Sequence, residues 1–220
     1  MLYEFCAENV TLLEKAMEAG AQRIELCDNL AVGGTTPSYG VIQAAVDLAK
    51  PYGATVMTMI RPRGGDFVYS NLEIEIMLTD IQKAKEAGSQ GVVFGVLTEK
   101  NEIDVLKMQR LLEACKGLEV VFHMAFDSIP AEYQFGEMDW LIENGVQRIL
   151  THGGPDSEPI EEHFAWLDEL IEHAADRIDI MPGGGIHLGN RQQIIDSLAV
   201  DQLHGTKIVF EGGLSCAGSR

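Results

Sequence analysis

Short apolar runs alternate with longer amphipathic segments along the chain, and this alternation predicts its architecture. The short runs have the length of buried strands, whereas the longer segments repeat their apolar positions with the period of a helix. The pattern predicts eight strands, at residues 2–6, 23–27, 54–61, 91–97, 119–126, 148–152, 177–182 and 201–205. It predicts seven helices between them, at residues 8–19, 39–50, 73–87, 102–115, 132–144, 160–174 and 188–198.

Strands that alternate with helices pair in parallel through right-handed crossovers. Eight of them favour closure into a TIM-type (β/α)8 barrel, a single domain over residues 1–220. An open doubly wound sheet is the alternative, but its GxGxxG fingerprint is missing after the first strand. The glycine-rich tail after Phe210 shows no helical pattern, so we expect the eighth outer helix to be missing or irregular. Bare strand surface there would favour a homodimer or a covering segment from elsewhere.

Side chains of a strand alternate between two faces, and helices cover the outer face of a barrel. Because Phe5 belongs to the outer face, Glu4 and Cys6 point into the barrel. The second strand repeats the phrase Glu-x-Cys with Glu25 and Cys27. If the two strands are in register, two carboxylates and two thiols crowd one side of the interior.

The same alternation turns Arg61 and His123 inward, places Asp127 at the rim and turns Met124 outward. Active sites of such barrels lie at the C-terminal ends of the strands. Buried charges there must pair with one another, for instance Glu25 with Arg61, or be wetted at a working site. We therefore expect a convergent polar set consisting of Glu4, Glu25, Arg61, His123, Asp127 and His204.

Three loops at this end have the composition of anion sites. Glycines follow the sixth and seventh strands, and an arginine-rich loop follows the third. Glycine lets backbone N–H groups approach an anion, although tight turns explain the same residues. The predicted anion-binding residues are Arg61, Arg63, Gly183, Gly184 and Gly185, with Asp66 and His152 as further rim residues.

The cysteines form no CxxC pair and no zinc-finger spacing. Two inward thiols on adjacent strands, Cys6 and Cys27, suit a soft ion such as Cu(I) as a linear pair. Small buried fillers are the other interpretation, and the spacing alone favours it. Cys115 and Cys216 are more consistent with incidental positions.

The formal net charge of −18 and pI near 4.6 argue against nucleic acid and anionic membrane surfaces as partners. The first 20 residues lack the pattern of a signal peptide, and no apolar run has the length of a membrane span. We therefore expect a cytoplasmic protein with reduced thiols.

Several stretches together resemble the CutC copper homeostasis proteins: EFCAEN, RIELCDNLAVGGTTPSYG, MIRPRGGDFVYS, GVVFGVL, FHMAFD, RILTHGG, IMPGGGI and LHG. The resemblance covers nearly the whole chain in order. It implies a TIM barrel, a cytoplasmic location and copper handling, with Cys6 and Cys27 at the positions proposed for Cu(I) ligands. The family's arginine, histidine and aspartate positions match Arg61, Arg63, His123 and Asp127.

The chain departs from the family pattern at Met124, where arginine is frequent, and at His152, where serine is usual. Two functions from different classes follow. One is a Cu(I)-binding copper homeostasis protein. The other is an enzyme acting on a small phosphorylated or carboxylated metabolite, with Glu25, His123 and Asp127 supplying general acid/base chemistry.

Overall fold

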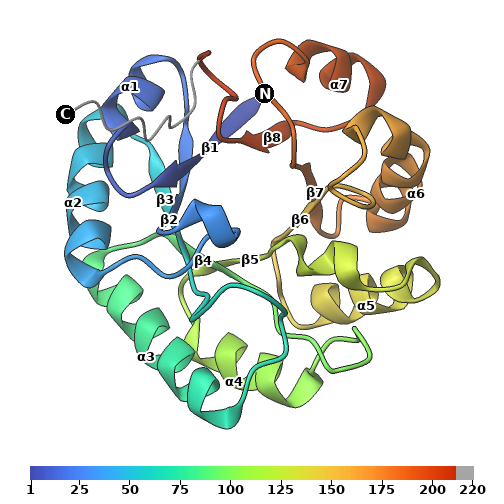
Figure 1. Cartoon of the computed structure of the whole chain (residues 1–220), viewed down its shortest axis with the longest axis horizontal. Coiled ribbons are helices and arrows are strands. Elements are labelled where there is room, and N and C mark those ends of the chain that lie inside the picture. Colours follow the sequence, from blue (N-terminus) through green and yellow to red (C-terminus); the bar gives the residue numbers. More distant parts are fainter. Residues whose placement is uncertain (212–220) are drawn as a thin grey trace.

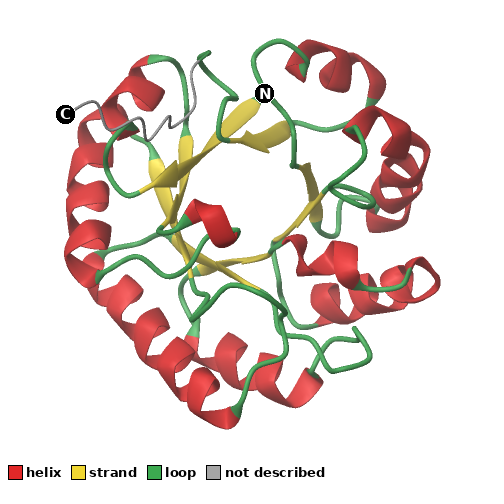
Figure 2. Cartoon of the chain, in the orientation of Figure 1, coloured by secondary structure: helices red, strands yellow, loops and turns green. Residues whose placement is uncertain are grey.

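The computed structural model describes residues 1–211 and shows a ring of eight parallel strands surrounded by helices (Figure 1, Figure 2). The strands are β1 (Leu2–Glu8), β2 (Arg23–Cys27), β3 (Thr55–Met59), β4 (Gly91–Phe94), β5 (Glu119–Phe122), β6 (Arg148–Thr151), β7 (Asp179–Pro182) and β8 (Gln202–Gly205). The α-helices of this part are α1 (Leu13–Glu18), α2 (Tyr39–Ala49), α3 (Asn71–Ala87), α4 (Val105–Ala114), α5 (Ala131–Glu143), α6 (Phe164–Ala174) and α7 (Arg191–Ser197).

The sheet closes on itself except at one seam. Its strand order is β7-β6-β5-β4-β3-β2-β1-β8, and β8 pairs with β1 through Leu2 opposite Gln202. Among the described residues no hydrogen-bonded ladder joins β7 to β8, although the two strands lie side by side. The predicted TIM-type barrel is therefore confirmed, and the open doubly wound sheet is wrong.

Two apolar layers confirm the predicted alternation of side chains. Phe5, Ile24 and Leu26 belong to the layer between the sheet and the helices. The barrel interior holds a separate sulfur-rich cluster of Cys6, Cys27, Met57, Met59, Val93, Val121, Leu150 and Met181. The interior therefore carries the residues whose chemistry goes beyond packing.

Several predicted boundaries are wrong by three residues or more, and two of them have a clear local cause. The helix expected from residue 8 begins only at Leu13, because β1 continues to Glu8 and ends at Asn9, which has a left-handed φ of 59°. The fifth strand ends at Phe122 instead of residue 126, because the His123 side chain accepts a hydrogen bond from Ala125 N and starts the 3-10 turn η3 (Met124–Ser128). Strand alternation does not extend into this turn, so Met124 lies against the interior cluster and not outside.

No helix follows β8 within residues 206–211. This segment nevertheless covers the apolar strand surface that we expected to be bare. Ile208 is fully buried, and the Phe210 ring lies 5.4 Å from that of Phe5 between centroids. The remainder of the tail, including Cys216, lies outside the described residues.

No helix in the described part of the chain has both the length and the hydropathy needed to cross a membrane.

Candidate functional site

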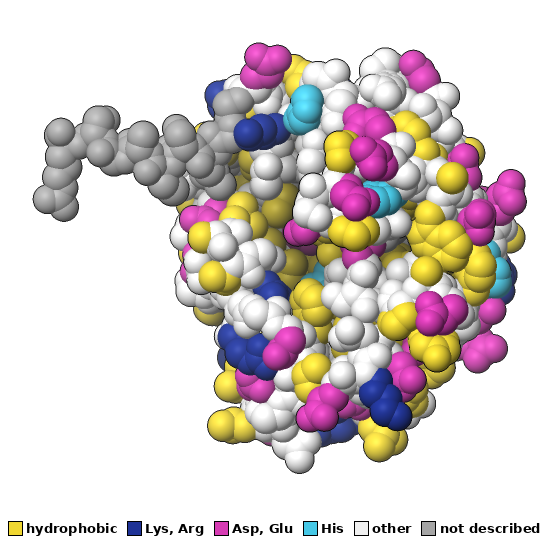
Figure 3. All heavy atoms as spheres, turned by 45° about the vertical axis from the view of Figure 1, so that its right-hand side comes forward, with side chains coloured by type: hydrophobic (Ala, Val, Ile, Leu, Met, Phe, Trp, Pro, Cys, Tyr) yellow, Lys and Arg dark blue, Asp and Glu magenta, His cyan; other side chains and the backbone are white. Residues whose placement is uncertain are grey.

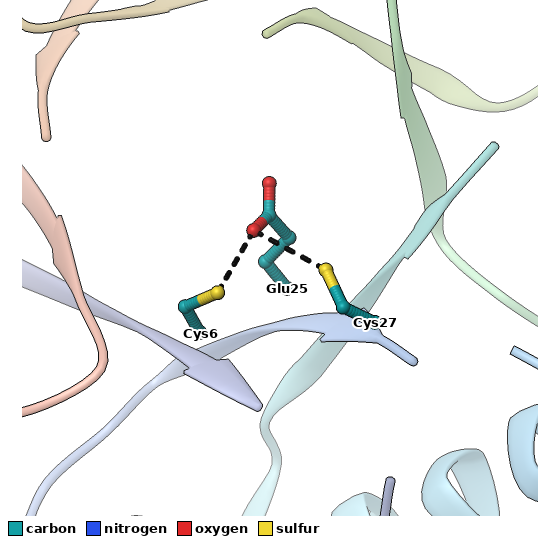
Figure 4. A group of neighbouring side chains, drawn as sticks. All are labelled: Cys6, Glu25 and Cys27. Atoms are coloured by element: carbon teal, nitrogen blue, oxygen red, sulfur yellow. Dashed lines mark hydrogen bonds between the residues drawn. The ribbon is translucent and has the colours of Figure 1, made fainter. Parts of the chain in front are cut away.

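Two thiols and one carboxylate meet inside the barrel, between β1 and β2 (Figure 4). The parallel register pairs Cys6 with Glu25 and Glu8 with Cys27, so the repeated Glu-x-Cys phrases are offset by two residues instead of lying level. This offset places the Glu25 carboxylate between the thiols, with Oε2 3.2 Å from Cys6 Sγ and 3.6 Å from Cys27 Sγ. All three residues are buried, and their ligand atoms lie within 4.8 Å of one another.

This environment changes the acidity of the cluster. The hydrogen bond from Cys27 lowers the pKa of the Cys6 thiol well below its ordinary value, against the opposing effect of burial. Burial raises the pKa of Glu25 well above its ordinary value. The two thiols and the Glu25 carboxyl group therefore form one polar group beside the apolar cluster of the barrel interior.

A second polar layer lies beneath the thiols, toward the N-terminal ends of the strands. Glu4 accepts hydrogen bonds from Arg23 and from His204 Nδ1, the latter at 2.8 Å. Burial acts to raise the pKa of Glu4, but His204 and Arg23 outweigh it and bring the pKa to about 2. His204 Nε2 lies 3.6 Å from Glu25, so this residue links the two layers. Glu4 thus lies in the interior and not at the rim.

Above the thiols, a cavity of about 490 Å³ opens at the C-terminal ends of the strands. It brings together six of the residues singled out from the sequence, from strands far apart in the chain. They are Cys6, Glu25, Arg61, His123, Asp127 and His204.

Arg61 does not pair with Glu25. Its Nη1 donates to the carbonyl oxygens of Val32 and Gly34 at 2.8 and 2.9 Å, and its Nη2 donates to that of Gly65 at 2.8 Å. Gly33 leaves room for this arrangement, since a Cβ there would lie 3.1 Å from Arg61 Nη1. The guanidinium therefore ties two loops together at the cavity wall.

His123 is buried beside this cation. Burial, and then the charge of Arg61, lower the pKa of His123 to about 3, so the ring is neutral at physiological pH. Its Nδ1 accepts from Ala125 N at 3.2 Å. Glycine at position 95 makes room for the His123 ring, because a Cβ on Gly95 would lie 2.9 Å from that ring.

Asp127 lines the cavity, but both of its carboxylate oxygens accept hydrogen bonds from the end of β6 and the loop that follows. It accepts hydrogen bonds from the Thr151 hydroxyl and from the backbone N–H groups of His152 and Gly153, at 3.0 to 3.2 Å for the backbone donors. Burial raises its pKa to about 6. This geometry assigns Asp127 to positioning the loop.

The remaining predicted residues lie outside this cavity. Arg63 pairs with Asp66 at 2.9 Å and with Glu73 at 2.6 Å, on the partly exposed side of the loop. His152 contacts the carbonyl oxygens of Gly183 and Glu158, both at 3.0 Å.

The glycines after β7 are explained by packing and turns. A Cβ on Gly183 would lie 2.5 Å from Leu150, and one on Gly184 would lie 2.7 Å from the His152 ring. Gly184 and Gly185 line two other hollows beside His187.

The strand alternation also turns Met181 inward, which the structure confirms, but the sequence reasoning missed the Met57 and Met59 thioethers and part of the cavity wall. Met57, Met59 and Met181 share the interior cluster with Cys6 and Cys27. The first two follow from the alternation in β3, which turns every second residue inward. The packing of Phe67 against His123, at 4.8 Å between ring centroids, joins a loop to a strand end and had no sequence signal.

Comparisons with known proteins show the family to which this chain belongs. The model of the CutC family matches residues 1–209. A CutC family protein of Enterococcus faecalis is 54% identical over 95% of this chain and 100% of its own length. The human "Copper homeostasis protein cutC homolog" is 42% identical over 92% of this chain and 72% of its own length.

A solved structure agrees with these matches. The crystal structure of the "Putative Copper Homeostasis Protein CutC" from Streptococcus agalactiae superposes with a TM-score of 0.92, at 50% identity over 94% of this chain and 99% of that one. The chain is therefore a member of the CutC family.

Proposed function

We propose that this chain is a cytoplasmic copper homeostasis protein that binds Cu(I) through Cys6 and Cys27. The observation that carries the proposal is the buried group of two thiols and the Glu25 carboxylate, whose ligand atoms lie within 4.8 Å of one another. Cu(I) prefers thiolate and thioether ligands. A reducing compartment keeps such thiols available.

The spacing suits one shared ion. Two metal–sulfur bonds of about 2.3 Å each, the length known for zinc thiolates, span at most about 4.6 Å. Small side-chain movements are enough to meet that limit from the observed spacing. Met57, Met59 and Met181 surround the thiols with soft, apolar sulfur, which excludes water from a bound ion.

The names of the human and streptococcal relatives support the copper role, because both refer to copper homeostasis. The acid/base enzyme that the sequence also suggested has weaker support. Asp127 has its oxygens engaged by the β6 loop, and His123 stays neutral with Nδ1 already accepting. Of the three proposed catalytic groups, Glu25 keeps an unpartnered oxygen, Oε1, and His123 keeps an unpartnered Nε2 among the described residues.

Titration with a chromophoric Cu(I) competitor tests the proposal. The Cys6→Ser/Cys27→Ser double variant is expected to lose at least about 100-fold in Cu(I) affinity, since hydroxyls are hard ligands. Cys115→Ser is the matched control, because Cys115 is also a buried thiol but lies at the end of α4, outside the cluster. Wild-type affinity in the double variant would overturn the assignment.

A further inference from the structure

Arg61 is a buried cation whose charge is not balanced by an acid. Its side chain belongs to a residue only 4% exposed, and its hydrogen bonds within residues 1–211 go to three neutral backbone carbonyls. A buried charge without a counter-ion is costly. The position is therefore suited to an anion that comes from outside the chain.

Arg61 and His123 both line the cavity, and each keeps a buried donor without a partner among the described residues. The three carbonyls occupy both N–H groups of Arg61 Nη1 and one of Nη2, and Nε has no partner among the described residues. The guanidinium thus keeps one N–H on Nε and one on Nη2. A guanidinium can bind a carboxylate with two parallel hydrogen bonds through such neighbouring donors.

His123 adds a donor of fixed identity. Because Nδ1 accepts from Ala125 N, the proton of the neutral ring resides on Nε2, which also has no partner in the described structure. Phe67 holds the two donors to the same wall, with its ring 4.8 Å from the His123 ring and 5.1 Å from Arg61 Cζ.

The size and lining of the rest of the cavity suit a ligand that carries an apolar part beside its anionic group. At about 490 Å³ the cavity is larger than an inorganic ion needs. The apolar part of the remaining wall consists of Leu30, Met59, Phe67, Met124 and Leu150. Its polar part includes the carboxyl groups of Glu25, Asp127 and Asp156; Glu25 lies against His204, and Asp127 accepts hydrogen bonds from the loop after β6.

We propose that the mouth of the barrel binds a small organic carboxylate, with the carboxylate on Arg61 and His123 and the apolar part against the methionines and leucines. A carboxylate matches one guanidinium edge and one imidazole N–H. A phosphate dianion would leave an oxygen and a second charge without partners among apolar side chains. Neither Arg61 nor His123 belongs to the thiol group, although Cys6 and Met59 line the same cavity.

Calorimetry on the metal-free protein tests the proposal with four probes. They are 3-methylbutanoate, 4-methyl-2-oxopentanoate, inorganic phosphate and 3-methylbutanamide, the last being an uncharged analogue of the first. We expect saturable binding of one or both carboxylates at millimolar concentration or below. We expect at least about 10-fold weaker binding of phosphate and of the amide. No binding of either carboxylate, or equal binding of all four probes, overturns the proposal.

Variants separate the groups involved. Arg61→Lys keeps the charge but removes the guanidinium edge, and should weaken carboxylate binding at least about 10-fold. Arg63→Lys is the control, since Arg63 lies outside the cavity and should leave the affinity unchanged. The Cys27→Ser variant should keep carboxylate binding while weakening Cu(I) binding, because Cys27 belongs to the thiol group but does not line the cavity. Failure of one proposal is therefore distinguishable from failure of the other.

Arg61 also ties two loops together, so its variant has a structural cost, and the wild-type protein supplies a second measurement. In ¹⁵N-labelled protein, the Arg61 Nε–H and His123 Nε2–H resonances should shift on addition of the carboxylate. Saturable binding that moves neither resonance, or full affinity in a folded Arg61→Lys protein, contradicts the assignment.

Discussion

Individual buried polar residues determine what each layer of the barrel can do. His123 shows this most directly, because one hydrogen bond to Ala125 N both ends β5 and fixes the ring tautomer. Its neighbour in the cavity, Asp127, uses its oxygens on the backbone of the β6 loop. Two residues that look alike as acid/base candidates in the sequence therefore have different roles, one as a donor and one as a support.

His123 should make the protein less stable in mild acid. Its folded-state pKa of about 3 lies below the ordinary 6.5, so the unfolded chain takes up a proton first as the pH falls. The stabilisation is complete above pH 6.5 and is lost progressively toward pH 3, at up to about 1.4 kcal/mol per pH unit.

Urea unfolding at pH 7.5, 6.5 and 5.5 checks this expectation. The difference in free energy of unfolding between wild type and His123→Gln should shrink as the pH falls, because glutamine does not titrate. A difference that stays constant over this range would show that His123 is not held neutral by the fold.

Asp127 should make the folded protein more stable in mild acid, which is opposite to the effect of His123. Its folded-state pKa of about 6 lies above the ordinary 3.8, so the folded protein takes up a proton first and gains stability as the pH falls from about 6 toward 3.8. Asp127→Asn removes the titrating group and places an amide against backbone donors. The variant should therefore lose more stability relative to wild type at pH 5 than at pH 7.5 in the same urea series. A loss independent of pH would count against the raised pKa.

At the scale of elements, much of the fold was predictable because strand alternation and helix period are local properties. The eight strands, the seven helices and the inward direction of Cys6 and Cys27 all follow from them. The alternation also gave the inward direction of Arg61 and His123, which share the cavity wall.

The predictions that failed concern contacts between segments that are distant in the sequence. The offset between β1 and β2 pairs Cys6 with Glu25, and no local pattern specifies that register. The carbonyls that hold Arg61 come from loops at Val32, Gly34 and Gly65, so the ion pair expected with Glu25 did not form. The partner choice of a buried charge is decided by these loops and not by strand alternation.

The segment after β8 makes a testable contribution of its own. Phe210 is 8% exposed, packs on Phe5, and has Lys15 Nζ 4.5 Å from its ring centroid. Phe210→Ala should therefore lower the free energy of unfolding by about 3 kcal/mol, at the low end of the range for buried phenylalanine.

Urea unfolding with Tyr133→Ala as control measures this contribution, since Tyr133 is 51% exposed and its loss should cost under about 1 kcal/mol. Equal losses in the two variants would mean that residues 206–211 do not stabilise the fold by covering the strand surface beside β1.

For the whole molecule, charge is distributed unevenly between surface and interior. The chain carries 34 acidic and 16 basic residues, and acidic side chains are spread over the face shown in Figure 3. Three arginines, Arg23, Arg61 and Arg148, are nevertheless buried among the interior layers and the loops. Glu4 and Glu25 are buried as well, so the interior charges nearly balance, and the excess of acids lies on the surface, where it favours cations in the surroundings.

This distribution predicts that salt stabilises the fold. Self-repulsion among exposed acids weakens as ionic strength rises, whereas exposed ion pairs such as Lys83 with Glu86 contribute little and lose little. Raising NaCl from 10 to 200 mM should therefore raise Tm by about 2–4 °C, the shift that corresponds to about 1 kcal/mol at this chain length. Chloride is preferable to sulfate, which is excluded from protein surfaces and stabilises by that route as well. A Tm that falls with NaCl would mean that attractive surface pairs outweigh the repulsion of the excess acids, and it would contradict the expectation that the exposed acids destabilise the fold.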